Sequence, residues 1–153
     1  MRCFYLLFVI LLCLATSCKK DTACEPLTAD QEAPQITEYN VKNAIGAIKH
    51  NNIYYKMVDT GTGVMPSSTS KVVVTYTGKM LNNTVFETAS TAKTFSLKDV
   101  IEGWQIGLPL VKKGGRVILI IPSVYAYGCT GNINLNIPPD AVLVYDIRLI
   151  DVL

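Results

Sequence analysis

The chain has 153 residues, half of them apolar, and its 14 basic and 12 acidic side chains give a formal charge of +2. This length suits one ordinary domain with little left over. So balanced a charge gives no electrostatic reason to expect nucleic acid as a partner.

The first residues have the composition of a targeting segment. Arg2 is followed by an apolar run from Phe4 to Ala15, which is shorter than the ~20 residues that a membrane helix needs. Small residues then precede Cys18, as in a signal peptide. The stretch also resembles the lipobox of bacterial lipoproteins, although the usual Leu is here Ala15. An ordinary signal peptide that contains a Cys is the alternative interpretation.

We therefore expect residues 1–17 to be a signal peptide and Cys18 to carry lipid. A lipid anchor would attach the protein to a membrane of the bacterial cell envelope. Two other cysteines, Cys24 and Cys129, lie beyond this segment. An exported location allows them to pair, but nothing in their local sequence favours a disulfide.

Residues 18–50 are expected to hold the lipidated Cys, a flexible tether and one possible short helix. From Lys19 to Gln35 the chain is polar, contains prolines and has no hydrophobic period. A partial helical register follows from Ile36 to Ile45. The folded domain is then expected over residues 51–153, with His50 in a solvated loop at the junction.

From Ile53 onward the sequence predicts strands, because β-branched and aromatic residues dominate and turn residues separate the runs. Alternation places Val72, Val74 and Tyr76 on one face of their strand. The same pattern places Leu143 and Tyr145 on one face of the last strand. The predicted strands cover residues 53–58, 71–80, 84–89, 116–122 and 141–152, and residues 93–97 could form a further short strand.

One short helix is predicted between these strands. Its apolar residues recur at helical spacing from Leu97 to Leu108, and Ser96 with Asp99 could cap its start. Gly103 and Gly107 favour a short helix, although nothing in the sequence explains why both are there. The sum is an α+β fold with about five strands, mostly antiparallel, packed on this helix.

The residues offer little for nucleophilic or metal chemistry. His50 is the only histidine, so a Ser–His or Cys–His pair would depend on it alone. The cysteines show no metal-binding spacing, and we expect neither a metal nor a cofactor. Asp99 and Glu102 are explained by a solvated helix face beside Lys98.

Aromatic residues in places that flank loops are the remaining candidates. Any one of them alone is more simply a core residue. Tyr125 and Tyr127, however, lie in a loop, and hydroxyls in apolar surroundings need partners that a ligand can supply. An aromatic pocket with a few hydroxyls is typical of small-ligand or proline recognition. The set comprises Tyr76, Phe86, Phe95, Trp104, Tyr125, Tyr127 and Tyr145.

Several stretches occur in an order that is specific in combination: "VVVTYTGKM", "VFETA", "VIEGWQIG", "YAYG" and "IPPDAVLVYD". Together they resemble the FKBP-type peptidyl-prolyl cis-trans isomerases over about residues 53–153, with one extra residue in the Gly131–Ile137 loop. The resemblance implies a twisted antiparallel sheet wrapped around one short α-helix. It also implies isomerisation of X-Pro bonds in unfolded or partly folded exported polypeptides, without a cofactor. We expect a monomer, because only a short segment precedes the domain.

The resemblance further implies a proline-binding pocket with Trp104 as its floor. The backbone N–H of Ile101 and the hydroxyl of Tyr127 would bind the carbonyls of the ligand. The helix is then expected to start nearer Glu102 than Leu97, because the preceding backbone must face the ligand. The implied catalytic residues are Tyr76, Phe86, Glu87, Trp104, Tyr127 and Tyr145, and the implied substrate-binding residues are Phe95, Val100, Ile101 and Ile137.

Two departures from the family pattern leave a second function open. Glu87 stands where the family has Asp, and Asn132 stands where His is frequent, in the altered loop. The alternative is a catalytically weak FKBP-like chaperone or partner-binding module on a lipoprotein anchor.

Overall fold

The computed structural model describes residues 24–153. The predicted signal peptide and the predicted lipidation of Cys18 lie outside the described residues. No helix in the described part of the chain is long and apolar enough to cross a membrane.

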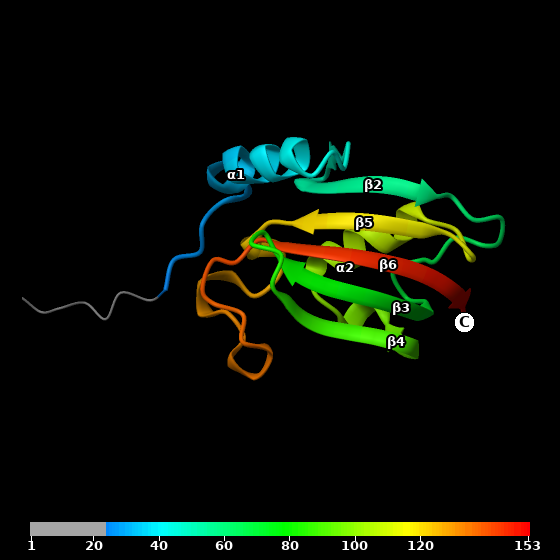
Figure 1. Cartoon of the computed structure of the whole chain (residues 1–153). Helices are drawn as coiled ribbons and strands as arrows, with labels where there is room; N and C mark the ends of the chain where they lie inside the picture. Colours follow the sequence, from blue (N-terminus) through cyan, green and yellow to red (C-terminus); the bar gives the residue numbers. More distant parts are fainter. Residues whose placement is uncertain (1–23) are drawn as a thin grey trace, which may run out of the picture.

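Within residues 24–153, six antiparallel strands form one sheet in the order β1-β2-β5-β6-β3-β4 (Figure 1). The prediction of an antiparallel sheet with one short helix against it is confirmed. About five strands were expected and six are present, because Ile48–His50 forms an additional strand. The possible further strand at residues 93–97 is the end of one continuous β4 rather than a strand of its own. The strands are β1 (Ile48–His50), β2 (Ile53–Asp59), β3 (Lys71–Met80), β4 (Val85–Ser96), β5 (Arg116–Ile121) and β6 (Leu143–Val152).

One face of the sheet carries the main core. Burial alternates along β3 and β6, so that Val74 and Tyr76 point to the same side as Ile147 and Leu149. The two strands are hydrogen-bonded neighbours in which Val74 is paired with Leu149 and Tyr76 with Ile147. The predicted alternation therefore holds on both strands, and it presents an apolar surface to the short helix.

That helix, α2 (Glu102–Gly107), lies against this face behind the sheet in Figure 1. A 3-10 turn over Leu97–Asp99 precedes it, so the prediction of a start near Glu102 is confirmed. The predicted capping by Ser96 and Asp99 is wrong, because Ser96 makes no side-chain cap hydrogen bond. The chain is extended between the turn and the helix, which leaves no continuous helix for Ser96 to cap.

The two glycines of α2 set how closely the helix approaches β5. A Cβ at Gly103 would lie 2.7 Å from Cδ1 of Ile121, and one at Gly107 would lie 2.6 Å from Cδ1 of Leu119. Both β5 side chains are fully buried. Glycine is therefore required where helix and strand approach most closely, which accounts for the two residues that the sequence left unexplained.

A second helix, α1 (Ala29–Lys42), covers the opposite face of the sheet. It starts with a capping box between Thr28 and Gln31. Its buried side chains Ile36 and Tyr39 pack with Ile120 of β5 and with Val142, Val144 and Ala47. The structure differs here from the expectation of a flexible tether up to Gln35 and a helix only after it. His50 likewise lies at the end of β1 rather than in a loop.

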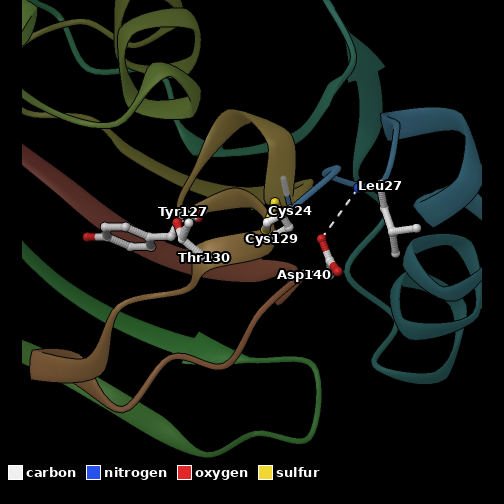
Figure 2. Close-up of a disulfide and its surroundings, with 6 residues drawn as sticks. All are labelled: Cys24, Leu27, Tyr127, Cys129, Thr130 and Asp140. Atoms are coloured by element: carbon white, nitrogen blue, oxygen red, sulfur yellow. Dashed lines mark hydrogen bonds between the residues drawn. A yellow bond between two sulfur atoms is a disulfide. The ribbon is translucent and has the colours of Figure 1, made fainter. Parts of the chain in front are cut away.

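A disulfide joins Cys24 to Cys129 across 105 residues, with the two Cα atoms 5.7 Å apart (Figure 2). It connects the segment before α1 to the long loop between β5 and β6. No local feature of the sequence indicates this bond, because only the fold brings the two residues together.

Candidate active site

A pocket of about 290 Å³ opens between the start of α2 and the adjoining part of the sheet. β3, β4 and β6 each contribute side chains, and the loop after β5 contributes Tyr127. The remaining lining residues come from α2 and from the turn before it. The lining consists of Tyr76, Glu87, Phe95, Asp99, Val100, Ile101, Trp104, Tyr127 and Tyr145.

Trp104 is held in place by three aromatic neighbours. Its ring centroid lies 5.0 Å from that of Tyr76, 5.2 Å from that of Tyr145 and 5.8 Å from that of Phe95. All three pairs meet edge to face, the geometry that the charge distribution of aromatic rings favours. Only 4% of the tryptophan is exposed. Its indole Nε1 has no hydrogen-bond partner among residues 24–153, so the pocket contains a rigid apolar surface with one unused donor.

Three tyrosine hydroxyls lie in this pocket together with the carboxylates of Glu87 and Asp99. Burial raises the pKa of Tyr145, and the nearby Tyr127 and Glu87 raise it further. Burial also raises the pKa of Tyr76, with hydrogen bonding to the Glu87 carboxylate adding to the effect. Burial raises the pKa of Tyr127 too. The three phenols therefore stay protonated at neutral pH and can donate hydrogen bonds.

The backbone at the mouth of the pocket is extended rather than helical. Val100 and Ile101 both have ψ angles in the extended range before the chain enters α2. The carbonyl of Ile101 accepts the N–H of Trp104 at 3.0 Å. The carbonyl of Val100 accepts the side chain of Gln105 at 2.8 Å. These bonds fix the short extended stretch whose side chains line the pocket.

Two predicted site residues, Phe86 and Ile137, do not line this pocket. The Phe86 ring packs edge to face on Tyr145 with 5.6 Å between centroids. Ile137 is buried in the core and also borders a separate shallow cavity beside Pro138 and Pro139. Phe86 therefore supports a pocket residue from behind, and Ile137 is a core residue beside another cavity. The other eight catalytic and substrate-binding residues that the resemblance implied line the pocket.

Gly78 is a supporting residue that the sequence analysis missed. A Cβ there would lie 2.6 Å from Cζ of Phe86 and 2.8 Å from Cε1 of Tyr145. Glycine at this point of β3 lets the two rings meet over the strand. A glycine inside a strand pattern is a recognised sign of such close approach, so a signal was present.

Asp99 and Tyr125 are placed differently from what the sequence suggested. Asp99 is exposed as expected, but it lies in the 3-10 turn directly before Val100 and lines the pocket rather than belonging to the α-helix. Tyr125 is not among the lining residues, and its hydroxyl accepts a hydrogen bond from Asn52 at 3.0 Å. Of the two loop tyrosines, only Tyr127 is therefore available to a ligand in the pocket.

The chemistry open to this pocket is binding and polarisation rather than bond cleavage. No three His, Cys, Asp or Glu side chains gather into a possible metal site within residues 24–153. The apolar floor at Trp104 fits a small ring, and the hydroxyls around it can donate to carbonyl oxygens. Such a site can hold a proline ring and the peptide groups beside it.

Comparison with known proteins gives a family for the chain. A family model described as "FKBP-type peptidyl-prolyl cis-trans isomerase" matches residues 63–150. The FKBP-type peptidyl-prolyl cis-trans isomerase FkpA of Escherichia coli (strain K12) is 39% identical over 103 residues, which cover 65% of this chain and 37% of that protein. A probable FKBP-type peptidyl-prolyl cis-trans isomerase of Haemophilus influenzae is 38% identical over 105 residues, covering 67% of this chain and 43% of that protein. The chain thus spans less than half the length of these two relatives.

Solved structures agree with this assignment. The crystal structure of FkpA from Escherichia coli superposes with a TM-score of 0.71 at 37% identity, covering 81% of this chain and 60% of that chain. A peptidyl-prolyl cis-trans isomerase from Pseudomonas syringae superposes with a TM-score of 0.69 at 30% identity, covering 85% of this chain and 98% of that chain. From its matched sequence, its sheet and its helix, the chain belongs to the family of FKBP-type peptidyl-prolyl cis-trans isomerases.

Proposed function

We propose that this chain catalyses cis-trans isomerisation of X-Pro peptide bonds in unfolded or partly folded exported polypeptides. The observation that carries the proposal is the aromatic pocket around Trp104, present in a chain of this family. Aromatic and aliphatic side chains make up most of the pocket lining, and the tyrosine hydroxyls are donors suited to peptide carbonyls. No acid–base pair or nucleophile is needed for the reaction.

The physics of the reaction suits such a site. Rotation about a peptide bond costs ~18–20 kcal/mol because resonance is lost on the way. At X-Pro bonds the two isomers are nearly balanced but interconvert only over tens of seconds or longer. The twisted amide is less polar than the planar one, so an apolar pocket favours it relative to the ground state. Binding that favours the twisted form lowers the barrier.

Each lining residue then has a physical role. Trp104 supports the proline ring, and Tyr76, Phe95 and Tyr145 hold the tryptophan rigidly. The Tyr127 hydroxyl and the backbone N–H of Ile101 donate to the carbonyls on either side of the rotating bond. Donors fixed before the reaction stabilise a carbonyl in its twisted position without having to reorganise.

A protease-coupled assay on an X-Pro peptide tests the proposal. We expect the full chain to accelerate cis-to-trans conversion, and Tyr127→Phe to lower kcat/KM about tenfold through loss of one hydrogen bond. Tyr54→Phe is the matched control, because Tyr54 packs with α1 on the opposite face of the sheet. A folded protein that gives no acceleration contradicts the proposal, as does an equal effect of the two tyrosine variants.

Glu87 favours a second candidate, a weakly active FKBP-like chaperone or partner-binding module. Its half-buried carboxylate lines the pocket beside Tyr76 and is one methylene longer than the family's Asp. Asn132 also departs from the family, and its side chain caps the 3-10 turn of Ile133–Leu135. Under this alternative, Glu87→Asp should raise kcat/KM clearly above that of the original chain. An unchanged value would remove Glu87 as its support.

We also propose that the protein is a lipoprotein attached to a membrane of the bacterial cell envelope through Cys18. The support is the sequence alone: an apolar run, small residues and then Cys18. Cys18→Ser should abolish incorporation of labelled fatty acid. Cys24→Ser is the matched control and should retain the label, because Cys24 is bonded to Cys129. Label that survives Cys18→Ser contradicts the anchor.

A monomer is the oligomeric state that we propose. The support is α1, which buries its apolar side chains against the sheet of its own chain. Sedimentation of the protein without its lipid should give the mass of one chain at micromolar concentration. A concentration-dependent dimer would contradict the proposal.

A further inference from the structure

The loop that carries Tyr127 is bonded to the N-terminal part of the chain on both sides of the tyrosine. One contact comes from α1 and another from the segment just before it. This loop leaves β5 at Ile121 and passes through two 3-10 turns, Ser123–Tyr125 and Gly128–Thr130. Tyr127 stands between the turns. Figure 2 shows the Cys24–Cys129 bond on one side of the loop and the Tyr127 ring pointing away on the other.

Glu32 of α1 makes the first of these contacts, a hydrogen bond to the loop backbone. One of its carboxylate oxygens accepts the backbone N–H of Ser123 at 2.7 Å, across 91 positions of sequence. Both residues are fully buried. Burial raises the pKa of Glu32, the hydrogen bond from the Ser123 N–H opposes the rise, and Asp140 adds to it. A buried carboxylate is costly for a fold, so stability alone does not explain why α1 carries one at this point.

The remaining contacts, a disulfide and two hydrogen bonds, lie just beyond Tyr127. Cys129, two residues further on, is bonded to Cys24. The carbonyl of Gly128 accepts the N–H of Asp140 at 2.9 Å. The Asp140 carboxylate in turn accepts the N–H of Leu27 at 3.4 Å, the dashed line in Figure 2. The backbone is therefore held four residues before and two residues after the tyrosine.

We propose that Glu32 and the Cys24–Cys129 disulfide are positioning elements of the active site, which fix the loop so that the Tyr127 hydroxyl meets the substrate carbonyl. The inference rests on the proposed isomerase function and extends it to a part of the chain outside residues 63–150, the range of the family match. A misplacement of about 1 Å at a reacting group can cost orders of magnitude in rate. The N-terminal segment then contributes to turnover without touching substrate.

The test compares kcat/KM on an X-Pro peptide for variants of the full chain. Glu32→Ala, and Cys24→Ser combined with Cys129→Ser, are each expected to lower kcat/KM about tenfold. Glu32→Gln should rescue turnover, because its amide oxygen can still accept the Ser123 N–H. Glu38→Ala is the matched control, an acidic residue on the exposed face of the same helix, and should leave turnover unchanged.

Repeating the substitutions in a Tyr127→Phe protein distinguishes a loss of positioning from a general loss of stability as the cause of a lower kcat/KM. With Tyr127→Phe already present, neither Glu32→Ala nor the double cysteine variant should lower kcat/KM further, since the hydroxyl that they position is gone. An equal loss in both backgrounds overturns the inference, and so does unchanged turnover in the original background. If Glu32→Ala fails to fold, the cysteine variant carries the test, because Cys24 is an exposed residue.

Amide hydrogen exchange tests the positioning of the loop independently of whether the chain has isomerase activity. An original chain with no isomerase activity refutes the function, and the loop is then assessed by exchange alone. We expect faster exchange over residues 123–131 in Glu32→Ala and in the double cysteine variant, with no change in β3. Unchanged exchange over the loop overturns the positioning role.

Discussion

Gly103→Ala is the sharpest perturbation of the helix that carries Trp104. The added Cβ would lie 2.7 Å from Cδ1 and 2.9 Å from Cγ1 of the fully buried Ile121. Overpacking of this kind costs ~1–3 kcal/mol, whereas replacing Gly by Ala in a helix gains up to about 1 kcal/mol. We therefore expect a net loss of about 1 kcal/mol in the free energy of unfolding. The loss in kcat/KM should be larger, because α2 must move away from β5 and Trp104 moves with it.

A second substitution, Ile121→Ala, should reverse the sign of the effect that Gly103→Ala has on the free energy of unfolding. It removes the side-chain atoms that the new methyl group would meet, at a cost of ~2–5 kcal/mol by itself. In that background Gly103→Ala should stabilise the protein, because only the helix propensity remains. Urea unfolding followed by the fluorescence of the single tryptophan measures all four proteins. If Gly103→Ala stabilises both backgrounds equally, α2 is not pressed against β5 and the account is wrong.

Further predictions concern ionisation and the disulfide. Burial raises the pKa of Tyr145 above its ordinary 10.0, so kcat/KM should stay flat from pH 7 to about 10; a fall near pH 9 would show an ionising phenol in the site. Burial, with Asp140 adding, raises the pKa of Glu32 above its ordinary 4.5. The native state then keeps this proton to higher pH than the unfolded chain, and the free energy of unfolding falls as pH rises above 4.5. Glu32→Gln should remove that fall, and equal slopes in the two proteins contradict it. Reduction of the Cys24–Cys129 bond, which spans 105 residues, should lower the free energy of unfolding by about 2–4 kcal/mol. Urea midpoints that are equal with and without dithiothreitol would refute that estimate.

Local patterns were enough to predict the sheet and the short helix. Alternation along β3 and β6 reports burial directly, because successive side chains of a strand face opposite sides. The start of α1 was missed although Thr28 and Gln31 form a readable capping box. Its buried stripe is narrow and lies in a polar, proline-containing stretch. The Cys24–Cys129 bond was beyond local reasoning, since its partners lie 105 residues apart.

Part of the candidate site could likewise be predicted from the sequence, and part of it could not. Residue type and position beside loops indicated the aromatic set, and the family resemblance gave its members their roles. The structure brings the ring centroids of Tyr76, Trp104 and Tyr145 within 5.0–6.1 Å of one another. Phe86 was placed in the same set, but it stands behind Tyr145 because strand geometry, not residue type, decides which ring faces the cavity. Gly78, Gly103 and Gly107 are needed because side chains of neighbouring elements lie too close for a Cβ. Such distances between elements cannot be read from any single stretch of sequence.

Nuclear magnetic resonance of the full chain with an X-Pro peptide can follow isomerisation and binding at Trp104 in one sample. We expect exchange cross-peaks between the cis and trans peptide, together with a shift of the Trp104 indole N–H resonance. The exchange and the shift should depend on peptide concentration in the same way, because one pocket gives rise to both. A peptide that exchanges no faster than in buffer would contradict the account. So would catalysed exchange that leaves the Trp104 resonance unmoved, since isomerisation would then take place outside this pocket.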